Sequence, residues 1–207
     1  MKKLLVLLFS FLILSSPSVF ADDISDFQIE GISIGDSLLD YMTEDEILEQ
    51  IELNKNRYGE LNEQTKYIQI NLFKDFQTYR GLGFLIKNNL INQYLTNKND
   101  KYKILSIFGE ISFNEDFEGC NKKLDEVVEI LSNKFPNATK REFSEVVLED
   151  SSGESFYEGT EFKFALEFDI EISCVNYEEN FRSKKNWSEG LRITIMSKEI
   201  IEWLNDF

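Results

Sequence analysis

The chain of 207 residues contains no histidine. Histidine is the base of Ser-His-Asp triads and Cys-His pairs, and it supplies ligands in H-E-x-x-H metalloproteases and many zinc sites. The sequence also lacks the S-x-x-K, P-loop and G-x-G-x-x-G motifs and an EF-hand loop. It therefore predicts no catalytic, cofactor-binding or metal-ligating residue.

Proline is almost as scarce. The chain has two prolines, and only Pro136 lies beyond the first 21 residues. No stretch rich in serine, glycine and proline separates one part of this sequence from another, so nothing marks a domain boundary. We expect residues 22–207 to form one domain, a length sufficient for a single sizeable core.

The first residues have the pattern of a secretory signal peptide. Lys2 and Lys3 precede an apolar run over residues 4–14, and Val19 and Ala21 are the small residues of a cleavage site. The run is shorter than the ~20 residues that span a bilayer, although an uncleaved anchor is the alternative. We expect cleavage after Ala21, no stable membrane anchor, and a periplasmic or secreted location in a bacterium.

Acidic residues exceed basic ones by 38 to 22, for a net charge of −16. Because Lys2 and Lys3 lie in the signal peptide and no acid does, its removal would bring the charge to −18. Sequence-independent affinity for nucleic acid or anionic lipid comes from basic patches, so neither is an expected partner. The charge favours solubility, with a cationic ligand as the alternative; an envelope protein or a small molecule remains a possible partner.

Two cysteines, Cys120 and Cys174, lie in the exported part. A pair of cysteines in an oxidising compartment most simply forms a disulfide, although two separate buried thiols are the alternative. Cys120 shares a helical face with Phe117 and Leu124, and Cys174 shares its strand parity with Ile172. If that helix covers that face of the sheet, the two sulfurs meet at one interface.

Hydrophobic periodicity predicts three helices. The first begins at a capping box formed by Thr43 and Glu46. The second runs from about Asn114 to Pro136, with one continuous apolar face. The third is capped by Ser197, with an apolar face of Ile200, Ile201, Leu204 and Phe207.

Between the helices, alternating and buried apolar runs predict strands. We expect a short extended segment at 29–34 and a hairpin whose loop is centred near Phe168. Gly109 is expected to mark a bulge. The other strands are expected at 67–73, 79–86, 102–113, 141–148 and 191–195. This order predicts an α+β fold, a mainly antiparallel sheet with helices packed on one face.

One short motif has the form of a catalytic signature. Gly35-Asp36-Ser37-Leu38 resembles the string that names the GDSL lipases and esterases, and it lies between an extended segment and a helical turn. In that family the serine needs a histidine base, which this chain lacks. We interpret the string as a chance match in which Asp36 or Ser37 caps a short helical turn.

The chain as a whole resembles a group of short secreted uncharacterised bacterial proteins. The resemblance rests on residues 27–47, Cys120 at the start of a helix, the Asp-x-Ser-Gly turn at 150–153, and Cys174 followed by Tyr177. It implies export and a disulfide, and it implies no activity.

Two classes of function remain. The absence of a catalytic constellation favours a non-catalytic binding or interaction module of the cell envelope. The alternative is a histidine-free hydrolase that works with paired carboxylates, for which Glu178 and Glu179, or the acids at 44–46, are candidates among many surface acids. Such an enzyme needs two acids about 5 to 10 Å apart in a concave pocket.

Overall fold

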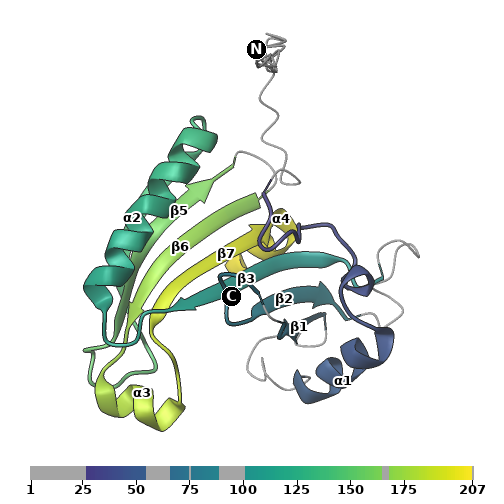
Figure 1. Cartoon of the computed structure of the whole chain (residues 1–207), viewed down its shortest axis with the longest axis horizontal. Helices are drawn as coiled ribbons and strands as arrows, with labels where there is room; N and C mark the ends of the chain where they lie inside the picture. Colours follow the sequence, from purple (N-terminus) through teal and green to yellow (C-terminus); the bar gives the residue numbers. More distant parts are fainter. Residues whose placement is uncertain (1–26, 55–65, 75, 89–100, 165–167, 207) are drawn as a thin grey trace, which may run out of the picture.

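The computed structural model describes residues 27–54, 66–74, 76–88, 101–164 and 168–206 (Figure 1). The expected signal peptide and its cleavage site after Ala21 lie outside these residues, and so does Phe207. Over the described ranges, no helix is long and apolar enough to cross a membrane.

Within these ranges, seven strands form one sheet in which every neighbouring pair is antiparallel, in the order β1-β2-β3-β7-β6-β5-β4. The expectation of an α+β fold with an antiparallel sheet is confirmed. The strands are β1 (Tyr67–Leu72), β2 (Leu82–Lys87), β3 (Ile104–Ser112), β4 (Thr139–Val146), β5 (Phe156–Lys163), β6 (Phe168–Asn176) and β7 (Gly190–Ser197).

Helices α1 (Glu44–Asn54) and α2 (Phe117–Lys134) pack on one face of this sheet, and α2 runs along β5 and β6 in Figure 1. The shorter α4 (Lys198–Asn205) packs on the opposite face, against Tyr67 and Leu105, so the expectation of helices on one face holds for α1 and α2 but not for α4. Helix α3 (Glu179–Lys185) lies beyond one end of the sheet. A 3₁₀ helix, η2 (Leu38–Asp40), precedes α1.

Strand parity explains the main core. Along β6, the even-numbered Phe168, Ile170 and Ile172 are buried under α2, whereas Asp169 and Glu171 have the opposite parity. The hairpin before β6 keeps this parity, as expected. Phe168, expected at the centre of the loop, instead lies in β6, since the paired residues begin with Lys163 opposite Asp169.

The capping box at the start of α1 is confirmed. The Glu46 amide donates to the Thr43 hydroxyl at 3.3 Å, and the Thr43 amide donates back to the Glu46 carboxylate at 2.8 Å. These reciprocal bonds satisfy backbone donors that the first helical turn leaves free.

The extended segment expected at 29–34 is wrong. Ile29 and Ile32 instead form a two-residue bridge around a tight turn, in which Glu30 and Gly31 both have positive φ, 53° and 78°. This turn folds the segment back and buries both isoleucines. The alternating sequence pattern is the same for such a turn and for a strand, so it cannot distinguish the two.

The bulge expected at Gly109 is also wrong, because the irregular register lies between Leu85 and Ile86. Gly109 is needed for space: a Cβ there would lie 2.6 Å from Cδ1 of Tyr79. Tyr79 thus packs across β3, and β2 begins only at Leu82.

The apolar face expected for the last helix is partly wrong. Ile200 is buried, but its buried neighbour is Trp203, and Leu204 is exposed. The Trp203 ring packs at a tilt against Tyr67 of β1, with the ring centroids 4.9 Å apart, so a contact far along the chain fixes how the helix is turned.

Cys120 and Cys174 form a disulfide, with their Cα atoms 6.0 Å apart. Both residues are fully buried between the first turn of α2 and β6. The bridge joins helix to sheet as the parity of the two residues predicts, and it is of the kind that persists in oxidising compartments.

Removing this bridge should destabilise the fold. A Cys174→Ser variant, or reduction of the wild type, should lower the free energy of unfolding by about 2 to 4 kcal/mol, because the unfolded chain regains the freedom of a long loop. Urea denaturation of the oxidised and reduced protein measures the difference. A change below about 0.5 kcal/mol would contradict a stabilising role.

Candidate functional site

A cavity of about 370 Å³ opens between the start of α2, helix α3 and the adjoining ends of β6 and β7. We call it the α2–α3 cavity. Its volume is within the range of about 300 to 1,000 Å³ typical of small-molecule sites. It is lined by Phe113, Glu115, Phe117, Cys120, Val175, Asn176, Tyr177, Glu179, Arg182, Glu189 and Gly190.

Local sequence explains how α2 borders this cavity. Asp116 caps the helix by accepting a hydrogen bond from the Gly119 amide at 2.9 Å. This leaves Phe117 and Cys120 on the inner side of the first turn, where the disulfide fastens the helix to β6. The disulfide is therefore part of the cavity wall.

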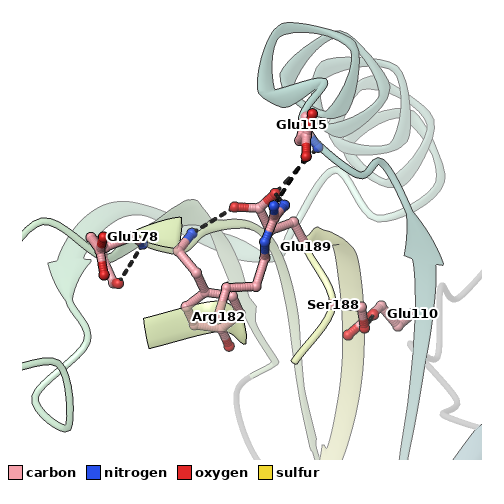
Figure 2. A network of polar contacts seen from close by, with 8 residues as sticks. Glu110, Glu115, Glu178, Arg182, Ser188 and Glu189 are labelled. Carbon is pink, nitrogen blue, oxygen red and sulfur yellow. Dashed lines mark hydrogen bonds and ion pairs between the residues drawn. The ribbon is translucent and has the colours of Figure 1, made fainter. Parts of the chain in front are cut away.

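An ion-pair network crosses the cavity (Figure 2). Arg182 of α3 donates through Nη1 to Glu189 at 2.6 Å and through Nη2 to Glu115 at 3.0 Å. Glu115 is 78% exposed, so this end of the network faces solvent. The hydrogen bond to Glu115 and the charge of Glu189 raise the pKa of Arg182 above its already high ordinary value.

Glu189 is the fixed centre of this network. It is only 6% exposed, and it accepts bonds from the backbone amides of Tyr177 at 2.9 Å and Glu115 at 3.2 Å as well as from Arg182. A buried carboxylate persists only when it is paired and hydrogen-bonded in this way. One side chain thus connects β6, the loop before α2, and α3.

Helix α3 is held in place by a second set of bonds. Glu178 caps it by accepting from the amides of Asn180 at 3.0 Å and Phe181 at 2.8 Å, and these bonds lower the pKa of Glu178. The Glu178 amide donates to the fully buried hydroxyl of Ser155 at 2.8 Å. Ser155 in turn donates to Asp150 at 2.6 Å.

Asp150 organises the turn beside α3. It accepts bonds from the hydroxyls of Ser155 and Ser152 and from the amides of both residues. These bonds, with the Ser155 hydroxyl first, lower the pKa of Asp150 to about 2. The Asp-x-Ser-Gly turn at 150–153 is present, and it is linked to the start of α3 through Ser155 and Glu178.

Three aromatic rings pack together around α3. Tyr177, Phe181 and Trp187 have ring centroids 5.3 to 5.9 Å apart. Burial raises the pKa of Tyr177, whose hydroxyl accepts a hydrogen bond from Arg192 at 3.0 Å. Tyr177 therefore stays neutral while it anchors α3 to β7.

A second hollow adjoins the cavity across Glu115 and Arg182. Its lining includes Arg80, Trp187 and Ser188, and the Ser188 hydroxyl donates to Glu110 (Figure 2). The charged groups of both hollows thus meet at the pair formed by Arg182 and Glu115.

The candidate acids named from sequence are placed separately. Glu44 and Glu46 lie at α1, where the Glu44 carboxylate accepts from Tyr102 and Glu46 belongs to the capping box. Glu178 caps α3 and only Glu179 lines the cavity. The structure therefore does not bring the two sequence-predicted pairs together as catalytic carboxylates in the cavity.

Two carboxyl groups outside the cavity have a raised pKa. Burial and the neighbouring charge of Glu161 raise the pKa of Asp169 and of Glu171. Both lie on β6, on the sheet face opposite α2, and neither lines the α2–α3 cavity. Among the residues that the structure describes, no group of acids or cysteines is arranged to hold a metal ion.

Ser37 is the cap of η2. Its hydroxyl accepts from the Leu39 amide at 3.3 Å and donates to the Lys101 carbonyl at 3.2 Å. The neighbouring Asp36 accepts from the Ser33 amide at 2.9 Å and the Tyr41 hydroxyl at 2.6 Å. These bonds agree with the capping interpretation of the GDSL string.

The sequence did not identify Arg182, Glu189 or Glu115 as site residues. Each is one charged residue in a chain that is 29% charged, and no local motif distinguishes it. The available signal was indirect: Glu189 directly precedes a buried strand, and an acid at that position needs a partner.

No family model, curated protein or solved structure matches this chain. The fold and the site together define an acidic α+β protein with one helix-to-sheet disulfide and a solvent-open cavity crossed by an ion-pair network.

Asp150 should make the fold sensitive to acid. Its folded-state pKa of about 2 is below the ordinary value of 3.8, so its contribution is complete above pH 4 and is lost as the pH falls toward 2. Asp150→Asn should therefore lower the stability at pH 7 and make the loss of stability between pH 4 and pH 2 smaller. Thermal unfolding of both proteins from pH 2 to 6 measures it, and parallel pH profiles would contradict the assignment.

Ser37→Ala should lower stability by about 0.5 to 2 kcal/mol, the usual effect of losing a helix cap. Because we assign Ser37 no nucleophilic role, a fluorophosphonate probe should leave the wild-type residue unlabelled. Denaturation and mass spectrometry test the two statements, and a covalent adduct on Ser37 would restore the esterase interpretation.

Proposed function

We propose that this chain is an exported, non-catalytic binding module of the bacterial cell envelope, and that the α2–α3 cavity receives its partner. The expected signal peptide and the disulfide support a periplasmic or secreted location. The proposal rests on one observation: Arg182 forms ion pairs with both Glu115 and Glu189. Charged groups fixed before a ligand arrives reduce the entropic cost of binding.

The same network argues for recognition rather than for proton transfer. A general acid or base needs a side chain that can reach the substrate. In the cavity, Glu189 is held by two backbone amides and by Arg182, and Glu115 is held by Arg182. Within the described residues, Glu179 is the lining carboxylate without a partner, and one such group does not make the pair that a hydrolase with paired carboxylates needs.

The charge of the cavity indicates the kind of partner. Three carboxylates, of Glu115, Glu179 and Glu189, face one guanidinium, of Arg182, which leaves two negative charges in excess. Within the described residues, the Glu179 carboxylate has no hydrogen-bond or ion-pair partner. The partner is therefore a cationic group on an apolar stem, belonging to a small molecule or to a basic segment of an envelope protein.

Aromatic side chains complete the recognition surface. Phe113, Phe117 and Tyr177 line the cavity beside the carboxylates. Aromatic faces attract cations and bury alkyl groups, so they suit a ligand with both parts.

Agmatine, which carries an amine and a guanidinium on a short alkyl chain, is a suitable probe. It should raise the melting temperature of the purified, disulfide-bonded protein in a dose-dependent way, whereas glutarate, an anion of similar length, should not. Glu179→Gln should weaken agmatine binding about fivefold, the effect of losing one exposed charge pair.

Glu129→Gln is the matched control. It removes the same charge from the exposed side of α2, about 18 Å along the helix from Phe117. If Glu129→Gln weakens binding as much as Glu179→Gln, the effect comes from overall charge. That result, or the absence of any shift with agmatine, would contradict the proposed site.

A further inference from the structure

Strand β4 forms one edge of the sheet. Among the described residues it pairs only with β5, and every residue in it except Phe143 is exposed. The unpaired backbone groups of an edge strand are a template for another strand. Proteins block such edges with bulges, prolines, short strands or charged side chains. Strand β4 is eight residues long, in regular register and without proline, and the four charges that it carries are of both signs.

The charges of β4 differ from those of the rest of the chain. Lys140 and Arg141 balance Glu142 and Glu145, so the strand is neutral in a protein of net charge −16. The net negative charge of the rest of the chain repels a second copy, but the neutral strand β4 adds nothing to that repulsion.

Geometry limits how two β4 strands can pair. Opposed residues of an antiparallel pair share one sheet face and one hydrogen-bonding class. A two-fold pair of identical strands therefore matches each residue with one an even number of positions away. A pair centred on Arg141 or Glu142 opposes identical charges, and one centred on Ser144 places Phe143 opposite Glu145.

The pair centred on Phe143 is self-complementary. It places Arg141 opposite Glu145 of the second copy, and it does so twice by symmetry. The two Phe143 residues lie opposite each other at the two-fold axis of the pair. Opposite charges and aromatic rings are favourable cross-strand pairs.

These three side chains are already held on one face by the neighbouring strand. Arg141 donates to Glu161 at 2.7 Å, and Glu145 accepts from the Tyr157 hydroxyl at 2.8 Å. The Phe143 ring packs edge-on against Tyr157 at 5.9 Å. A second strand would meet side chains that are already ordered.

We infer that two copies of this chain associate through antiparallel pairing of their β4 strands about an axis at Phe143, which joins two seven-stranded sheets into one. The pairing also places Val146, 53% exposed, opposite Lys140 of the second copy, and Leu148, 89% exposed, follows the paired residues. The interface is distinct from the α2–α3 cavity, so it stands or falls independently of the proposed ligand.

Sedimentation equilibrium over a concentration series tests the inference with a matched pair of variants. Glu145→Arg sets like charges opposite each other twice and should weaken the dimer at least about tenfold. Glu142→Arg makes the same charge change on the other face, opposite Ser144, and should leave dimerisation within about twofold. Circular dichroism checks that both variants fold.

Cross-linking tests the register. Phe143→Cys places its thiol opposite its own copy, so a disulfide-linked dimer should form on mild oxidation. Val146→Cys faces Lys140 and should not cross-link. A wild type that is monomeric up to about 1 mM, the weak end of ordinary affinities, overturns the inference. Equal effects of Glu145→Arg and Glu142→Arg, or equal cross-linking of both cysteine variants, also overturn it.

Discussion

The packing of α2 on β6 and β7, fastened by the Cys120–Cys174 disulfide, is the interaction on which the rest of the structure depends. It buries the apolar face of α2, the longest of the described helices, in the main core. It also holds the first turn of α2 against β6, because Cys120 lies in that turn. The loop before α2 consequently brings the Glu115 amide to Glu189, and the cavity forms between that loop and α3.

A large negative charge is accommodated by local pairing. Glu161 on β5 receives both Arg141 at 2.7 Å and Lys163 at 3.3 Å. Asp169 and Glu171 nevertheless have raised pKa values, so the folded state takes up protons there more readily than the unfolded chain. Protonation of these two groups adds to the stability of the fold as the pH falls through their raised folded-state pKa values. The contribution of Asp150 is instead lost as the pH falls below about 4. The opposing signs limit the net effect of mild acid.

Much of this fold could be predicted from the sequence, because the relevant patterns are local. The capping box at Thr43, the apolar face of α2 and the parity of Cys174 each follow from a few neighbouring residues. The site could not be predicted, because Glu189 depends on Tyr177, Arg182 and Glu115, the last of them 74 positions away. The turn at Glu30 and Gly31 was missed because an alternating pattern has the same appearance in a strand and in a folded-back segment.

The central claim is that the disulfide, by fixing the start of α2, builds the cavity. Amide hydrogen exchange of the oxidised and reduced protein tests it most directly. The account predicts that reduction first removes protection from the amides of Glu115, Tyr177 and Cys120, while the amides of β1 and β2 stay protected. Loss of protection spread evenly over the sheet, or none around the cavity, would contradict it.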